Sequence, residues 1–113
     1  EISDLERQWR RNERVERCTD CGGIIKSATI SFGQPMPDDA MLRAQEYTEN
    51  ADLMLTIGST LIVNPAAGFP KYAKQLGAKL VILNRESTPL DEMADLVIHD
   101  EIGPALSFVV GIN

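Results

Sequence analysis

Three short, mostly apolar runs in the second half of the chain limit what it can fold into. They cover residues 53–57, 79–83 and 95–98, and a segment with the pattern of a helix, residues 65–76, separates the first two. Apolar runs of this length are typical of strands in a parallel sheet that is buried on both faces. With a closing helix over residues 103–110, the order of elements predicts an α/β fold: a parallel sheet with helices on both faces.

Glycine, proline and acidic residues set the ends of the expected helices. Acidic residues in the first turn predict a helix that starts at residue 38 and continues to about residue 50. Pro65 suits the first turn of the next helix and Gly77 ends it. Pro70, inside that helix, is expected to kink it or to delay its start.

The first third of the chain is less regular. Residues 1–17 carry five basic and five acidic side chains, which predicts a charged helix. Residues 24–32 are rich in β-branched side chains and predict an extended segment. Two prolines within residues 33–37 exclude a regular central strand there.

Composition and charge exclude several classes of protein. Hydrophobic residues make up 43% of the chain and charged residues 25%, as in ordinary globular domains. The apolar runs are too short to span a bilayer, and no segment has the features of a signal peptide. The net charge of −6 lies within residues 18–113 and would repel nucleic acid and anionic lipid. We therefore expect no direct nucleic-acid or membrane partner. We expect an intracellular protein in the cytoplasm, with the nucleus as the alternative location.

Polar residues follow two of the expected strands, at the edge where parallel sheets bind their ligands. Residues 58–60 offer a glycine for close backbone approach and two hydroxyl groups for phosphate or ribose oxygens. Residues 84–86 include an acid, which at this place commonly accepts hydrogen bonds from ribose hydroxyls. Either turn alone is also common in loops that bind no ligand. The sequence has neither of the common glycine-rich nucleotide-binding motifs. Together the turns indicate a nucleotide-type ligand across two strand ends.

Two cysteines, Cys18 and Cys21, are the metal-ligand candidates. Their two-residue gap suits two thiolates on one metal ion, or a redox pair. A structural zinc site needs four ligands, and His99, the one histidine, lies far along the chain. The sequence therefore supplies half of a conventional zinc site. No catalytic set is visible, and His99 at a strand end is more typical of a structural or surface group.

These motifs together resemble the sirtuin family. Residues 18–26 (CTDCGGIIK) resemble the second zinc cysteine pair of sirtuins, and residues 30–37 (ISFGQPMP) are similar to their Val-x-Phe-Gly-Glu-x-Leu-Pro segment. Residues 51–67 (ADLMLTIGSTLIVNPAA) look like their Ala-Asp-Leu-x-Leu-x-Ile-Gly-Thr-Ser-Leu-x-Val-x-Pro-Ala run. Residues 80–91 and 94–98 resemble the two strands that follow, in the family's order and spacing.

The resemblance implies an NAD-dependent protein-lysine deacylase, which passes an acyl group to ADP-ribose and releases nicotinamide, and which holds a structural zinc. It implies that residues 38–113 are the C-terminal part of a Rossmann-like NAD-binding domain. Residues 1–37 then form a remnant of the zinc-binding module and a segment facing the acylated-lysine substrate. The implied NAD contacts are Gly58, Ser59, Thr60, Asn84, Arg85, Glu86 and Ile102. The resemblance also implies that one segment pairs with the backbone of the substrate peptide as an added strand, and its residues are Ile30, Ser31, Phe32 and Gly33. Cys18 and Cys21 would be two of four zinc thiolates.

The sequence also departs from the sirtuin pattern. Gln34 replaces the usual Glu, and Gly-Ser-Thr replaces Gly-Thr-Ser. The family's Gly-Ala-Gly-Ile-Ser loop, catalytic histidine and first cysteine pair have no counterpart in the chain, and His99 does not align with that histidine. We therefore expect the C-terminal part of a sirtuin deacylase, without a catalytic residue and inactive alone. The alternatives are a non-catalytic nucleotide-binding α/β module and a self-associating structural domain, with self-association through the incomplete zinc site.

Overall fold

The computed structural model describes residues 2–11 and 17–112 of the chain. The chain forms two compact units, one over residues 1–36 and the other over residues 37–113. Within the described residues, every helix is too short or too polar to cross a bilayer.

In its described residues, the first unit contains one helix and a tight turn. Helix α1 (Ile2–Arg10) carries surface ion pairs between Arg7 and Asp4 and between Arg10 and Glu6. Arg17 forms an isolated antiparallel bridge with Ile24, so the predicted helix over residues 1–17 is wrong at its end. The part of that prediction over residues 12–16 lies outside the described residues. Residues 25–31 form neither helix nor strand, because no second strand in the described chain lies beside them.

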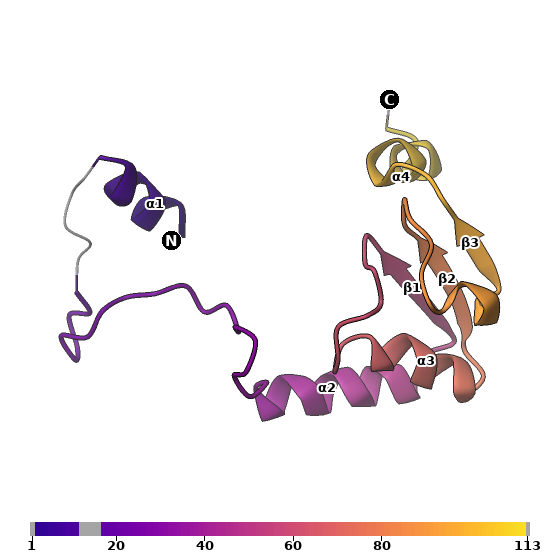
Figure 1. Ribbon diagram of the computed structural model, residues 1–113, viewed down its shortest axis with the longest axis horizontal. Helices are drawn as coiled ribbons and strands as arrows, with labels where there is room; N and C mark the ends of the chain where they lie inside the picture. Colours follow the sequence, from indigo (N-terminus) through magenta and orange to yellow (C-terminus); the bar gives the residue numbers. More distant parts are fainter. Residues whose placement is uncertain (1, 12–16, 113) are drawn as a thin grey trace. The chain divides into compact units, whose positions relative to one another are not determined.

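The second unit is built on a three-stranded parallel sheet (Figure 1). Its elements, in chain order, are α2 (Asp38–Glu49), β1 (Leu53–Ile57), α3 (Gly68–Gln75), β2 (Lys79–Leu83), the 3-10 helix η1 (Asp91–Met93), β3 (Leu96–Ile98) and α4 (Ile102–Val110). The strands lie in the order β1-β2-β3, with Leu53 opposite Lys79 and Val81 opposite Leu96. The predicted parallel α/β order is therefore confirmed.

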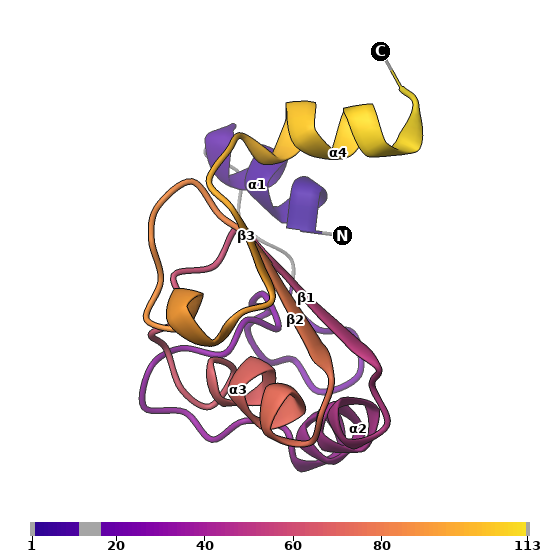
Figure 2. The same ribbon diagram turned by 90° about the vertical axis from the view of Figure 1, so that its right-hand side faces the viewer.

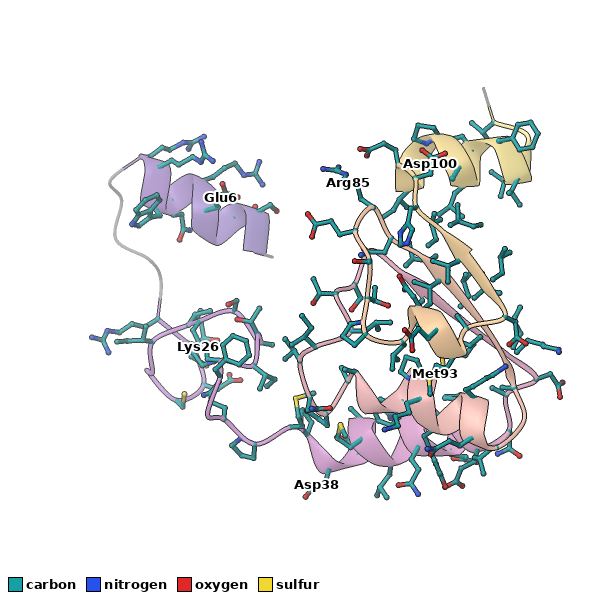
Figure 3. The ribbon with its side chains drawn as sticks, turned by 45° about the vertical axis from the view of Figure 1, so that its right-hand side comes forward. Glu6, Lys26, Asp38, Arg85, Met93 and Asp100 are labelled. Atoms are coloured by element: carbon teal, nitrogen blue, oxygen red, sulfur yellow. The ribbon has the colours of Figure 1, made fainter. Side chains whose placement is uncertain are left out.

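The core lies between the sheet and α3, which packs against β1 and β2 (Figure 2). Leu80 and Ile82 of β2 are fully buried, and Ala73 of α3 is equally inaccessible. Fully burying a leucine or isoleucine side chain contributes about 1.5–3 kcal/mol. Met93 of η1 packs against this cluster, and Figure 3 shows it between η1 and α3.

The opposite face of the sheet is largely uncovered. Leu53, Leu55 and Ile57 of β1 are 57%, 48% and 40% exposed, and Leu96 of β3 is 51% exposed. Helix α4 lies beyond the carboxyl ends of the strands rather than over this face (Figure 1). The predicted helices on both faces are therefore wrong for the described residues, which cover one face. The apolar pattern shows that both faces can be buried, but the described chain supplies a cover for only one.

Proline and glycine residues lie at the ends of α3 and α4. The predicted place of Pro65 in the first turn of α3 is wrong, because the helix starts at Gly68, and Pro70 is its third residue. Pro70 thus delays the helix start, because a residue in the first turn needs no partner for its backbone N–H group. Gly111 ends α4 in the left-handed conformation, with φ of 71°.

Candidate functional site

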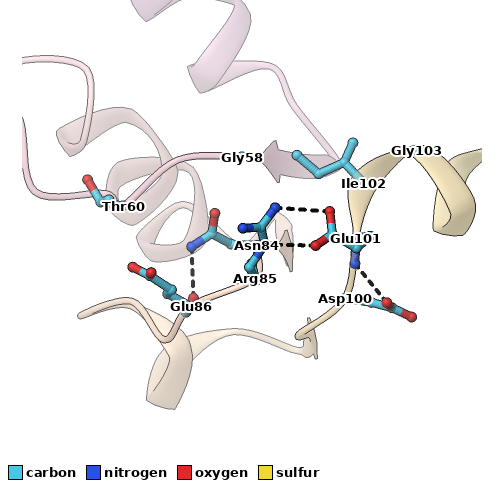
Figure 4. Close-up of a pocket in the computed structure, with 9 residues that line it drawn as sticks. All are labelled: Gly58, Thr60, Asn84, Arg85, Glu86, Asp100, Glu101, Ile102 and Gly103. Atoms are coloured by element: carbon cyan, nitrogen blue, oxygen red, sulfur yellow. Dashed lines mark hydrogen bonds and ion pairs between the residues drawn. The ribbon is translucent and has the colours of Figure 1, made fainter.

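A pocket of about 280 Å³ opens at the carboxyl edge of the sheet. Three chain segments build it: the turn after β1, the turn after β2, and the connection from β3 into α4 (Figure 4). The residues that line it are Gly58, Thr60, Asn84, Arg85, Glu86, Asp100, Glu101, Ile102 and Gly103. The structure therefore brings together six of the seven residues that the resemblance assigned to NAD.

Gly58, directly after β1, lies close to Ile102, the first residue of α4. Its φ is 62°, and a Cβ atom built on it would lie 2.8 Å from Cδ1 of Ile102. Its N–H group donates to the carbonyl of Leu83 at 2.9 Å, so the turn starts as a continuation of the sheet. A larger side chain would strain the backbone and displace Ile102 from the pocket wall.

Ser59 is the seventh of these residues, and it does not line the pocket. Its Oγ accepts a 3.2 Å hydrogen bond from the N–H group of Leu61, which has a φ of 54° and is buried. The Ser59 hydroxyl therefore supports the turn, while Thr60 lines the pocket.

Asn84 holds the turn after β2. Its backbone N–H group donates to Ile98 at 3.1 Å, and its Nδ2 donates to the carbonyl of Glu86 at 2.7 Å. These two bonds extend the sheet by one residue and then close the chain into a tight turn. The turn places the carboxylate of Glu86 at the pocket as a hydrogen-bond acceptor.

Arg85 and Glu101 form a bidentate ion pair at the pocket (Figure 4). Nε of Arg85 lies 2.9 Å from Oε1 of Glu101, and an Arg85 NH2 group lies 3.0 Å from Oε2. Asp100 accepts a 2.7 Å hydrogen bond from the N–H group of Glu101. The pocket thus combines one guanidinium with three carboxylates, a set rich in acceptors for the hydroxyl groups of a ribose.

Sequence reasoning missed Asp100, Glu101 and Gly103 as pocket residues. A signal was present, because two acids and a glycine follow the third strand at the same edge of the sheet as residues 58–60 and 84–86.

Cys18 and Cys21 lie on a tight turn in the first unit. The N–H group of Cys18 donates to Gly23 at 3.0 Å, and the N–H group of Gly22 donates to Cys18 at 2.9 Å. Hydrogen bonds from the backbone of Cys21 and then of Asp20 lower the pKa of the Cys18 thiol. Both cysteines are free thiols. In the described ranges, no group of three or more histidine, cysteine or acidic side chains gathers around a metal position, so the two thiols fit half a site.

The predicted substrate segment, residues 30–33, contains a small turn. The N–H group of Ser31 donates to Oε1 of Gln34 at 2.8 Å, and the N–H group of Gln34 donates to the carbonyl of Ser31 at 3.0 Å. Phe32 is 91% exposed and Ile30 is 44% exposed. Pairing of a peptide through Ser31 would require this turn to open, and the pairing role of the segment stays a prediction.

Comparison with known proteins decides the family. Residues 2–65 match the family model described as Sir2 family. The chain belongs to the Sir2 family. Among curated Sir2 proteins it is 54% identical over 109 residues to an NAD-dependent protein deacetylase of Rhodopseudomonas palustris. It is 36% identical over 111 residues to an NAD-dependent protein deacetylase of Thermodesulfovibrio yellowstonii. These matches cover 96% and 98% of this chain but 43% of each relative, so the chain spans less than half the length of these Sir2 proteins.

Solved Sir2 structures have the same fold over nearly the whole chain. A structure from a study of the mechanism and regulation of Sir2 enzymes matches with a TM-score of 0.81 and 33% identity. The match covers 99% of this chain and 45% of the other. Sir2Tm bound to a propionylated peptide matches with a TM-score of 0.79 and 31% identity, over 99% of this chain and 48% of the other. The resemblance to sirtuins that the motifs indicated is therefore confirmed.

Proposed function

We propose that residues 37–113 form the part of an NAD site that binds the adenosine ribose, within an NAD-dependent protein-lysine deacylase. The observation that carries the proposal is the pocket at the carboxyl edge, where Gly58, Asn84 and Glu86 meet in a Sir2-family chain. The acyl group would pass from lysine to ADP-ribose with release of nicotinamide, as the resemblance to sirtuins implies.

The size and chemistry of the pocket support a nucleoside rather than a whole dinucleotide. Its volume, about 280 Å³, lies just below the range of about 300–1,000 Å³ that holds whole small ligands. Glu86, Glu101 and the Asn84 side chain offer oxygens to ribose hydroxyls, and Thr60 offers a hydroxyl to a phosphate. When bound, NAD would supply the electrophilic ribose, and these residues would hold and orient its adenosine end.

The affinity of the isolated chain for NAD is expected to be low. Each hydrogen bond to a partly hydrated ligand contributes about 0.5–1.5 kcal/mol. Three or four such bonds must offset several kcal/mol of lost translational and rotational freedom. We therefore propose millimolar or weaker binding of NAD by the 113-residue chain.

No histidine or cysteine is among the residues that line the pocket. The family's catalytic base is a histidine that has no counterpart in this sequence, so we propose no turnover by this chain alone. The same observation favours the alternative, a non-catalytic nucleotide-binding module. The two readings differ in the parent reading frame: a deacylase also encodes the Gly-Ala-Gly-Ile-Ser loop and the histidine.

The first unit fits two further parts of the proposal. Cys18 and Cys21 would contribute two thiolates to a structural zinc, and the lowered pKa of Cys18 favours the thiolate that zinc binds. Residues 30–33 would face an acylated-lysine peptide, and the propionylated peptide bound to Sir2Tm supports this class of partner. A cytoplasmic location and self-association through the incomplete zinc site complete the proposal.

Nicotinamide release tests the catalytic part of the proposal. The purified chain is incubated with NAD and an acetylated peptide, and nicotinamide is quantified against a sample without peptide. We expect no release above background. Release that disappears on Asn84→Ala would mean that this chain carries its own catalytic group, and the assignment of the chemistry to residues outside it would be wrong.

A further inference from the structure

His99 connects the end of β3 to both ends of the loop that follows β2. Its Nδ1 lies 2.9 Å from the backbone oxygen of Asn84, and its Nε2 lies 3.2 Å from Oδ2 of Asp91. The chain between those two contacts carries Arg85 and Glu86, which line the pocket. One imidazole ring therefore fastens the loop that supplies one side of the candidate site.

Asp91, the second contact of the ring, is itself held firmly. Its Oδ1 accepts a 2.6 Å hydrogen bond from the hydroxyl of Thr88, and its Oδ2 accepts a 3.1 Å bond from the Thr88 N–H group. Thr88 is buried, with 8% of its surface exposed. The bonds from Thr88, and then the nearby His99, lower the pKa of the Asp91 carboxyl. The ring thus contacts a fixed carboxylate.

The two ring nitrogens of His99 face one acceptor each. The backbone oxygen of Asn84 and the carboxylate of Asp91 can only accept hydrogen bonds, and they lie at the two ends of the loop. The ring therefore spans the loop from Asn84 to Asp91.

We propose that His99 is a positioning residue for the NAD site: its ring bridges Asn84 and Asp91, and so holds Arg85 and Glu86 at the pocket. This inference rests on the proposed function.

The test compares wild type with His99→Gln in the 113-residue chain, by amide hydrogen exchange and by NAD titration followed by NMR. Glutamine keeps a donor for the carbonyl of Asn84 but cannot carry a charge. Without ligand, we expect amide exchange at residues 86–88 and 90 to be about fivefold faster in His99→Gln, the effect of losing one contact worth about 1 kcal/mol. The chemical-shift changes of the pocket residues, plotted against NAD concentration, should have an initial slope that is lower in His99→Gln by a similar factor.

NAD binding separates positioning from a purely structural role. Asp91→Asn keeps the ring and removes the carboxylate that the ring contacts. If His99 positions the pocket loop, this variant should also show faster exchange at residues 86–88 and 90 and weaker binding of NAD, whereas a purely structural role would change the exchange alone. Lys71→Gln, an exposed change in α3, is the matched control for a substitution by glutamine. Protection of the β2 amides from exchange reports whether each variant is folded. If His99→Gln does not fold, Asp91→Asn replaces it in the comparison with wild type.

The outcomes distinguish this inference from the proposed function. If NAD changes the NMR signals of the pocket residues in wild type but His99→Gln leaves both the amide exchange and the NAD-induced slope unchanged, the positioning role is wrong and the proposed function stands. If NAD changes the NMR signal of no pocket residue in wild type, while His99→Gln still speeds amide exchange in the loop, the proposed function fails. The histidine then stabilises the loop and has no role in binding NAD.

Discussion

Nζ of Lys74, in α3, lies 2.6 Å from Oδ2 of Asp95, the residue that precedes β3. The same oxygen accepts a 2.8 Å hydrogen bond from the backbone N–H group of Leu80, in β2. One carboxylate thus joins the covering helix, the central strand and the start of the edge strand. The hydrogen bonds from Lys74 and then from Leu80 hold the pKa of Asp95 at about 2.

Asp95→Asn is expected to lower the stability of the second unit. The change removes the charge that Lys74 contacts, and we expect Tm to fall by about 4–8 °C, the effect of one lost hydrogen bond in a domain of this size. Thermal unfolding at neutral pH measures it. Asp39→Asn, which breaks an exposed pair with Arg43 at 3.4 Å, is the control and should leave Tm nearly unchanged.

The pH dependence of stability follows from the same carboxyl. The pKa of Asp95 is about 2 when folded and about 3.9 in an unfolded chain. A depressed pKa means that the stabilisation is complete above about pH 4 and is lost as the pH falls towards 2. The Tm of wild type should therefore fall more than the Tm of Asp95→Asn as the pH is lowered from about 4 to 2. Equal losses in both proteins would rule out the Asp95 contribution.

Gly58→Ala tests the close approach of β1 and α4. Alanine at a φ of 62° with Ile102 at 2.8 Å is expected to cost about 1–3 kcal/mol, mostly from backbone strain. Gly68→Ala is the matched control, because Gly68 is the first residue of α3 and has nothing within 4 Å of its added Cβ atom. This second change should be neutral or stabilising. Urea unfolding compares the two, and equal effects would contradict the account of Gly58.

Zinc binding tests the half site at Cys18 and Cys21. Two thiolates leave zinc two ligands short, so one chain should bind zinc weakly, or two chains should share one ion through four cysteines. Metal analysis and light scattering on the same zinc-treated sample give stoichiometry and mass. Cys21→Ser should abolish both binding and pairing, whereas Thr19→Ser should not. Tight binding of one zinc per monomer, with no other ligand found, would contradict this prediction.

Local sequence patterns were enough to predict most of the second unit. The strands over residues 53–57 and 79–83 have the predicted bounds, because each mostly apolar run ends at a glycine or a polar residue. The third strand begins one residue later than predicted, at Leu96. Asp95 was included with it, but its carboxylate turns to Leu80 and Lys74 instead. Contacts with residues distant in the sequence determined that boundary.

Other features depend on information that a local pattern does not hold. An apolar strand shows that its two faces can be buried, but not whether the same chain provides both covers, and Leu53 and Leu55 are exposed. Glu101, which follows β3, forms an ion pair at the pocket with Arg85, which follows β2. Ser59 was predicted to face the ligand, but its hydroxyl turns back to the N–H group of Leu61. A pairing such as that of Arg85 with Glu101 becomes visible only once the strands are placed side by side, whereas the Ser59 contact depends on the conformation of its own turn.

An NMR titration of the isotope-labelled chain with NAD tests most directly whether the carboxyl edge of the sheet binds this dinucleotide. We expect chemical-shift changes that concentrate at the pocket, at Gly58, Thr60, Glu86 and Ile102. They should approach saturation only near 1 mM NAD or above, which corresponds to a binding free energy of about −4 kcal/mol or weaker. Asn84→Ala should reduce these shifts, and Asp39→Asn should not. Shifts confined to residues outside the pocket, or none at millimolar NAD in a folded chain, would contradict the assignment of this edge of the sheet to NAD.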